Sequence, residues 1–541
     1  MWRHLLGIGA ATASFLLSSP VSTLSDPSLE IKDYLPIREA AGGQIKALPP
    51  SASPDAQTET PRAIGERSPG AASVPPEISP PISVPAVREA SAPPGSAAGA
   101  PAQAQLDRIV SIRTVRVAAP PGMPGASEPD LDLDPLDLAR MAISVTASRV
   151  TEAGQAPYPV FVSGNAGESW ERSLGLGPFP IADPGLEFDA GGRLYLSALD
   201  ASVPGGSRGV VVARSDDGGR SFTHRGFAMD ASTSFLFPDG SRHSGCNAGG
   251  GPLFDYPKLT ADQSARSPFR GAIYLLALAE GFDRNGDGVC EGGAYVIIRT
   301  RDGGETWEGG RVFEGMQLHT NRLAVSPDGS ITVAQAVDGT GPGGRRPEIR
   351  IHRSTDGGAT FSSVRAFPAG AALEPSTTWV AADPSDAAKL YVAFEGRVKG
   401  GDEIGHVFVI RSIDSGATWQ QPVQVDSDDH DGSQSEALRP ALAVSASGRL
   451  DLAWFDYRHS TPGHLAANRQ AGDVYFATSS DGGATWSRNL RLNKVSAPAI
   501  FAPGNAFLTL LSQPDRALAA FALDTDANHL YETWLAEIRF R

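Results

Sequence analysis

The segment Thr300-Arg-Asp-Gly-Gly-Glu-Thr-Trp307 is one copy of an eight-residue pattern that recurs along the chain. The pattern reads Ser/Thr-x-Asp/Asn-x-Gly-x-Ser/Thr-Trp/Phe, and its other copies start at Ser163, Ser215, Ser354, Ser412 and Ser479. An Asp or Asn side chain can accept bonds from nearby backbone amides, and the glycine two residues later suits a positive φ. The pattern therefore predicts tight turns with a structural role, each held by one of Asn165, Asp217, Asp302, Asp356, Asp414 and Asp481.

A second repeat, made of short apolar strands, runs out of phase with these turns. Its copies begin near Pro184, Pro257, Asn321, Thr378, Arg439 and Asn505. Each copy continues through a turn into a second strand, and a third strand, such as AYVIIRT at 294–300, leads into the eight-residue turn. The repeating unit is therefore a sheet of four antiparallel strands, with the turn between the third strand and the fourth.

Four-stranded sheets that repeat in this way are typical of the blades of a β-propeller. Six copies of the strand repeat predict an all-β, six-bladed propeller. The last copy has three strands and no eight-residue turn, so we expect an N-terminal strand to complete it. Residues 141–176 hold about three more strands, which makes a seven-bladed ring the alternative. RIVSIRTVRV at 108–117 is a candidate for a further short strand.

The N-terminal part of the chain has a different composition. An apolar stretch of 13 residues, 5–17, follows Arg3 and His4 and predicts a secretory signal over residues 1–25, with a buried helix as the alternative. Thirteen prolines fall between Pro49 and Pro101, so we expect residues 26–130 to form a disordered linker. The propeller is then expected over 131–541, in a protein that is secreted, periplasmic or displayed on the cell surface.

Charge and hydropathy exclude several functions. The 46 Lys+Arg and 61 Asp+Glu residues give a net charge of −15, which argues against a nucleic-acid partner. No apolar run reaches 18 residues, so we expect no transmembrane segment once the signal is removed. No motif for an organic cofactor is present, and the sequence does not indicate an oligomeric state.

An insertion between the second and third turns contains both cysteines, Cys246 and Cys290. In an exported protein this placement predicts a disulfide, with two free thiols as the alternative. Beside Cys290, the oxygen-bearing side chains follow the spacing of a calcium-binding loop, although position 12 is Ala294 and not Glu. A structural Ca²⁺ is predicted at Asp283, Asn285, Asp287 and Glu291, and a plain Asp/Gly turn is the alternative.

The eight-residue copies resemble the Asp-box, or bacterial neuraminidase (BNR) repeat, of the sialidase superfamily. The resemblance covers about residues 141–541 and implies a propeller with the boxes at the blade periphery. It also implies a glycoside hydrolase, in which three arginines bind the substrate carboxylate and a Tyr activated by Glu is the nucleophile. The family's Arg-Ile-Pro motif is absent, because the first inner strand reads PGLEFD at 184–189. Asp-boxes also occur in propellers without catalysis.

Ligands of propellers bind where the inner strands converge, so residues at the ends of these strands are the candidates. The resemblance implies anion contacts from Arg322, Arg439 and Arg458, with Tyr457 and either Asp456 or Glu395 nearby. Salt bridges between blades are the alternative role of these charges. Two functions remain open: an exo-α-sialidase or related hydrolase of acidic glycans, and a non-catalytic propeller that binds glycan or protein at the cell surface.

Overall fold

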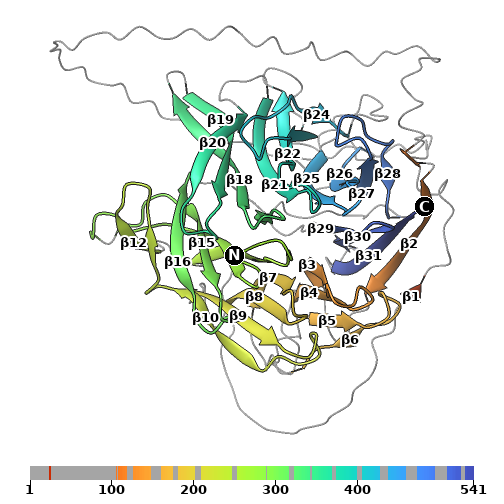
Figure 1. Ribbon diagram of the computed structural model, residues 1–541, viewed down its shortest axis with the longest axis horizontal. Helices are drawn as coiled ribbons and strands as arrows, with labels where there is room; N and C mark the ends of the chain where they lie inside the picture. Colours follow the sequence, from red (N-terminus) through yellow and green to blue (C-terminus); the bar gives the residue numbers. More distant parts are fainter. Residues whose placement is uncertain are drawn as a thin grey trace, which may run out of the picture. The chain divides into compact units, whose positions relative to one another are not determined.

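The computed structural model describes most of the chain from Gln105 to the C-terminus. The described residues are 24–25, 105–106, 108–117, 126–147, 160–174, 181–200, 209–246, 253–287, 289–315, 322–341, 344–367, 373–398, 405–426, 437–458, 472–493, 508–524 and 531–541. They form seven sheets whose strands pair antiparallel except for one short parallel pair, and the first strands of successive sheets contact one another in chain order, with the seventh against the first. Figure 1 shows these sheets following one another around a common centre, as the blades of a propeller do.

The first four blades follow the order of the sequence. The first contains β3 (Ala126–Leu133), β4 (Met141–Ala147), β5 (Val160–Ser163) and β6 (Glu171–Arg172). The second contains β7 (Ile181–Phe188), β8 (Leu194–Asp200), β9 (Gly209–Ser215) and β10 (His224–Asp230). The third contains β13 (Phe254–Ala261), β14 (Ile273–Ala279), β15 (Ala294–Thr300) and β16 (Glu308–Glu314), extended by β11 (Ser234–Leu236) and β12 (Arg242–Ser244). The fourth contains β17 (Ala324–Val325), β18 (Ile331–Gly341), β19 (Gly344–Ser354) and β20 (Ser362–Phe367).

The remaining blades include the one that closes the ring. The fifth contains β21 (Leu373–Ala382), β22 (Leu390–Val398), β23 (Gly405–Ser412) and β24 (Val423–Gln424). The sixth contains β25 (Ala437–Val444), β26 (Leu450–Asp456), β27 (Asp473–Ser479) and β28 (Leu490–Arg491). The seventh contains β29 (Leu508–Ser512), β30 (Arg516–Asp524), β31 (Tyr531–Phe540), β2 (Ile109–Val117) and the two-residue β1 (Leu24–Ser25).

The blade number differs from the main prediction: the ring has seven blades and not six. The additional blade is the first, and its inner strand β3 contains the acidic stretch 130–134 up to Leu133, with the hydrophobic side chains Leu131 and Leu133 buried. The expected linker, 26–130, therefore includes β2 and the start of β3. The rest of that linker and nearly all of the expected signal lie outside the described residues.

The ring is closed by an N-terminal strand, as the three-stranded last unit predicted. β2 pairs antiparallel with β31, and Ile112 faces Ile538 while Val115 faces Leu535. All four side chains are buried. The seventh blade therefore combines strands from both ends of the described chain, and the next strand after β2 is β3 of the first blade.

The eight-residue turns have the predicted position and hydrogen bonding. In the copy at Thr300, Asp302 Oδ1 accepts from Thr300 Oγ1 and from the amide of Thr306, at 2.8 and 2.9 Å. The amide of Gly304 donates to Thr300 Oγ1, and Gly304 has φ of 90°. The same bonds hold the other five copies, including the one that has Asn165 in place of Asp.

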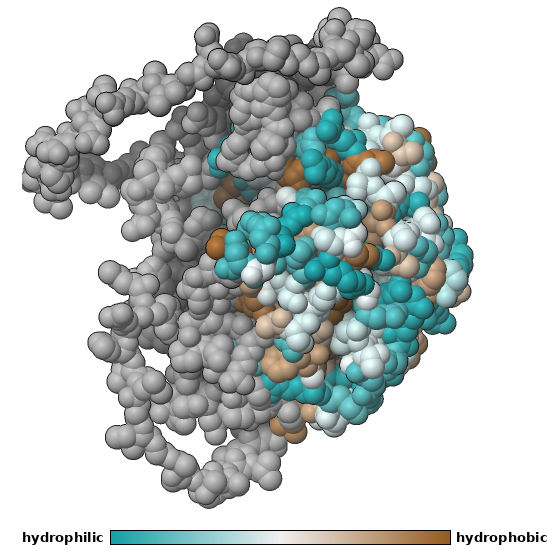
Figure 2. Space-filling view, turned by 90° about the vertical axis from the view of Figure 1, so that its left-hand side faces the viewer, coloured by the Kyte–Doolittle hydropathy of each residue, from teal (hydrophilic) through white to brown (hydrophobic). Residues whose placement is uncertain are grey.

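The coloured residues on the face drawn in Figure 2 form no broad apolar patch. In Figure 2 the coloured residues are mainly hydrophilic or neutral, and the hydrophobic patches are small and separate. The described residues contain no helix that is long and apolar enough to cross a membrane.

Candidate functional site

Arg322, a predicted anion contact, lies in a buried ionic network between the inner strands. Its guanidinium is 2.5 Å from Asp130 Oδ1 and 2.9 Å from Glu187 Oε2. Burial by itself would raise the pKa of Asp130, but the charges of Arg322 and Lys258 hold it below its ordinary value. Asp130 also accepts from the amide of Leu186, and Glu187 accepts from the amide of Ala261. Arg322 therefore joins the inner strands of several blades, which is the inter-blade role that the sequence left open.

Arg458 and Asp456 form a second buried pair. Asp456 accepts two bonds from the guanidinium, from Nε at 2.9 Å and from Nη2 at 2.7 Å. The guanidinium also stacks over the Tyr475 ring, 4.0 Å from its centroid. Asp456 and Arg458 are almost fully buried, whereas Tyr457 between them is half-buried. The alternation of neighbouring residues thus separates Tyr457 from Asp456, as expected for the end of a strand.

Four inner strands begin with the same strained conformation. Glu128, Asp183, Tyr256 and Arg439 have φ of 54°, 51°, 49° and 54°, and each precedes a proline. A register shift in β3, β7, β13 and β25 accompanies each of them. Left-handed φ is costly for such side chains, and a following proline disfavours helical conformations of the residue before it. Backbone strain of this kind is common at functional sites. Its recurrence in four blades therefore indicates that a functional site lies at this end of the ring.

The residues around these positions form what we call the strand-entry cluster. All of them lie at the end of the ring where the inner strands begin and the second strands end. The cluster consists of Glu128, Asp183, Asp255, Tyr256, Glu395, Arg439 and Tyr457.

One side of the cluster holds three carboxyl groups from three different blades. Burial raises the pKa of Asp255 to about 9, and a hydrogen bond with the Asp183 side chain adds to the shift. Burial, together with the charge of Asp183, also raises the pKa of Glu128 well above its ordinary value. Carboxyl groups this close cannot all ionise at once. Asp255 is therefore protonated at neutral pH and can act as a proton donor.

The other side of the cluster holds Arg439, Glu395 and Tyr457, from the fifth and sixth blades. Burial lowers the pKa of Arg439, and the nearby groups Tyr256, Glu395 and Tyr457 act in the opposite direction. Burial raises the pKa of Tyr256, and the charges of Asp255 and Asp183 raise it further, so this phenol keeps its proton. Tyr256 thus interacts electrostatically with both sides of the cluster.

Of the predicted site residues, the structure brings Arg439, Glu395 and Tyr457 together. It places Arg322 and Arg458 in ion pairs, with Asp130 and Asp456 respectively. Sequence reasoning missed Glu128, Asp183, Asp255 and Tyr256. The local signal was present, because an X-Pro dipeptide opens four of the inner strands: Glu128-Pro129, Asp183-Pro184, Tyr256-Pro257 and Arg439-Pro440.

The insertion in the third blade contains the predicted disulfide between Cys246 and Cys290. The proposed calcium ligands are used within their own loop: Asp283 Oδ1 accepts from the amide of Gly286 at 2.7 Å, and Asn285 Nδ2 donates to Glu291 Oε1 at 2.7 Å. Asp287 Oδ1 accepts from the amide of Val289. Within the described ranges, no group of three or more acidic, His or Cys side chains has the arrangement of a metal site. Calcium binding here stays a prediction.

Solved structures with a similar fold include enzymes that act on glycans. A Hadza microbial sialidase is 18% identical, with a TM-score of 0.41 over 73% of each chain. The intramolecular trans-sialidase from Ruminococcus gnavus is 12% identical, with a TM-score of 0.39 over 67% of this chain and 94% of that one. An α-L-arabinofuranosidase from Fusarium graminearum is 13% identical, with a TM-score of 0.36 over 66% and 93%. No protein-family model and no curated protein matches the sequence. Any assignment of activity therefore depends on the strand-entry cluster.

Proposed function

We propose that this protein is an exported glycoside hydrolase whose active site is the strand-entry cluster. The observation that carries the proposal is the pKa of Asp255, raised to about 9 beside the carboxyl group of Asp183. Glycoside hydrolysis needs an acid that keeps its proton at working pH and a carboxylate on the other side of the scissile bond. Asp255 would protonate the leaving oxygen, and Glu395, across the cluster, would stabilise the positive charge that develops on the sugar or attack it.

The charge of the cluster favours a neutral glycan as substrate. An exo-α-sialidase needs several arginines for the substrate carboxylate, but carboxylates already pair with Arg322 and Arg458. Arg439 is the one predicted arginine in the cluster, where it lies near Glu395 and Glu128. The cluster has one arginine beside four carboxyl groups, so it offers the carboxylate of an anionic substrate a single guanidinium contact.

Export is supported by two observations. The sequence begins with a basic start and a short apolar stretch, and the Cys246–Cys290 disulfide suits an oxidising compartment. A glycan outside the cytoplasm, on a cell surface or in the medium, is the partner that agrees with both.

The test is turnover of a panel of fluorogenic glycosides by the full chain, including a sialoside, an arabinofuranoside and neutral hexosides. We expect Asp255→Asn and Glu395→Gln each to lower kcat by about 100-fold or more on the substrate that is turned over. Asp216→Asn, at an exposed position on the periphery, is the control and should leave kcat unchanged. Wild-type activity should fall as the pH rises through about 9, because Asp255 then loses its proton.

A matching stability measurement separates loss of chemistry from loss of fold. A carboxyl whose pKa is raised by folding destabilises the folded state progressively as the pH rises from about 4 to about 9. Asp255→Asn should therefore be more stable than the wild type at pH 8 although it is inactive. An active Asp255→Asn variant would refute the assignment, and glycan binding without turnover of any substrate would favour the non-catalytic propeller.

A further inference from the structure

At the end of the ring opposite the strand-entry cluster, arginines tie one blade to the turn of the next. The arginine directly before an eight-residue turn donates to a backbone carbonyl oxygen in the following blade's turn. Three such bonds join Arg214 to Gly303, Arg299 to Gly357 and Arg411 to Gly482. Arg113 of β2 makes the corresponding bond to the carbonyl of Ala166 across the ring closure.

The junction between the first and second blades is built differently. Val162 precedes the first blade's turn, and it faces Ala142 on the neighbouring strand. In the second, third and fifth blades the corresponding cross-strand pairs are Tyr195 with Arg214, Tyr274 with Arg299 and Tyr391 with Arg411. No described residue supplies the arginine bond to Gly218, the carbonyl that corresponds to Gly303.

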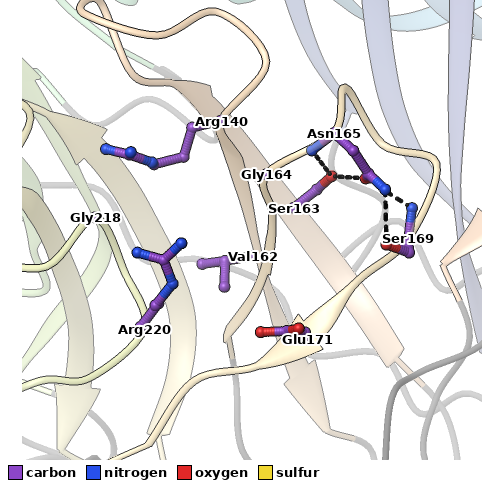
Figure 3. A pocket seen from close by; sticks show the side chains of 9 residues that line it. All are labelled: Arg140, Val162, Ser163, Gly164, Asn165, Ser169, Glu171, Gly218 and Arg220. Atoms are coloured by element: carbon purple, nitrogen blue, oxygen red, sulfur yellow. Dashed lines mark hydrogen bonds between the residues drawn. The ribbon is translucent and has the colours of Figure 1, made fainter.

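A pocket of about 220 Å³ lies at this junction, beside Val162 and Gly218. Arg140, Arg220 and Val162 line it, together with Glu171 and the turn around Asn165. Figure 3 shows the guanidinium groups of Arg140 and Arg220 on one side of Val162 and the hydrogen-bonded turn of Asn165 on the other.

The lining of this pocket has two guanidinium groups and one carboxylate. Arg140 is 2.7 Å from the buried carboxylate of Asp134 and 3.8 Å from that of Asp137, whereas the guanidinium of Arg220 is exposed and 3.5 Å from a backbone carbonyl. The turn that lines the pocket is the one copy of six with Asn, at Asn165, so a negative charge found in the other five is missing here. Glu171 is the pocket's one lining carboxylate.

We propose that this pocket binds a small oxyanion between the guanidinium groups of Arg140 and Arg220. Guanidinium groups bind carboxylate and sulfate oxygens through paired, charge-assisted bonds. The volume is below the roughly 300–1,000 Å³ of sites for larger ligands, so the pocket suits one anionic group or one acidic monosaccharide. The site is separate from the strand-entry cluster and does not depend on the proposed activity.

The test is isothermal titration of the full chain with sodium sulfate and, separately, with sodium glucuronate, at constant ionic strength. The wild type should bind at least one of them, and Arg220→Gln should weaken that affinity by at least tenfold. Binding of sulfate alone would identify a free inorganic anion, and binding of glucuronate would identify an acidic sugar. Absence of binding to both, or equal affinities of wild type and Arg220→Gln, would overturn the proposal.

A second variant separates the pocket from general electrostatics. Val162→Arg restores the arginine found in the neighbouring blades, fills the pocket and supplies a donor for the Gly218 carbonyl. We expect it to abolish anion binding while the urea midpoint stays equal or rises. Arg301→Gln removes an exposed positive charge from the third blade's turn and should leave the affinity unchanged. Wild-type affinity in Val162→Arg would show that the anion binds elsewhere.

Discussion

At the scale of single residues, two of the six turns contain backbone strain that the other four avoid. Ala166 and Ser415 have φ of 58° and 61°, at the position where the other copies have glycine. The left-handed conformation costs an L-residue roughly 1–2 kcal/mol, and glycine avoids this cost. Glycine loses more chain entropy on folding, which removes roughly 0.5–1 kcal/mol of the benefit. Ser415→Gly should therefore raise the free energy of unfolding by up to about 1 kcal/mol in urea titrations. Ser480→Gly, where φ is not positive, should lower the free energy of unfolding. A lower free energy of unfolding in both variants would contradict the proposed strain at Ser415.

The Asp side chains of the turns predict a specific dependence of stability on pH. Hydrogen bonds from Thr418 and Ser412 lower the pKa of Asp414 to about 2, and Thr306 and Thr300 do the same for Asp302. Because folding lowers these pKa values, the stabilisation is complete above about pH 4 and is lost as the pH falls toward 2.

The first blade supplies the matched variant for this dependence, since Asn165 makes the same turn bonds without a titratable group. Asp414→Asn should fold normally at pH 7 and show a smaller drop of its urea midpoint between pH 4 and pH 2.5 than the wild type. Asp414→Ala should be less stable at both pH values. Identical pH profiles of wild type and Asp414→Asn would mean that the lowered pKa does not contribute to stability.

At the scale of strands and loops, the sequence predicted every element that depends on local pattern. Spacing and hydropathy predicted the turns, the inner strands of six blades and the strand at 108–117. β3 was missed because Asp130 and Asp132 look like a solvated acidic patch. Their partners, the amides of Leu186 and Phe188, lie 56 residues away in the chain and are brought close only by the ring.

The same reason explains the missed half of the strand-entry cluster. Asp183 and Asp255 belong to different blades, and neither has a distinctive motif of its own. The hydrogen bond between their side chains depends on the angle between neighbouring blades, which no local pattern encodes. The ion pairs of Arg322 and Arg458 with Asp130 and Asp456 were likewise beyond spacing arguments, although salt bridges were the stated alternative for these arginines.

The disulfide in the third blade's insertion allows a prediction for that element. Cys246 and Cys290 are separated by 44 residues, for which the chain-entropy model gives roughly 4 kcal/mol. We expect the double variant Cys246→Ser/Cys290→Ser to unfold at a lower urea concentration than the wild type. Its free energy of unfolding should be lower by about 2–4 kcal/mol. Reductant should lower the wild-type midpoint to the same value and should not affect the variant. A wild-type midpoint that reductant leaves unchanged would show that the insertion does not unfold together with its blade.

At the scale of the whole molecule, the two ends of the ring have different structural roles. The eight-residue turns and their arginines hold neighbouring blades together at one end, and five of six turns use an ionised Asp for this. At the other end, four blades contribute strained residues, and two of these blades also contribute carboxyls with raised pKa, Glu128 and Asp255, which costs stability. A closed ring can hold such strain because each blade is packed between two others.

Ring closure by β2 is therefore the feature on which the whole molecule depends. Ile112, Val115 and Val117 are buried against the seventh blade, and each contributes about 1.5–3 kcal/mol. Upstream of β2, Gln105 also bonds the sixth blade's turn, at Thr485. A chain that starts at residue 97 should keep the full-length urea midpoint, whereas one that starts at residue 120 should lose cooperative unfolding and aggregate through the exposed edge of β31. A cooperative transition at the full-length midpoint in the shorter chain would show that the ring does not need this closure.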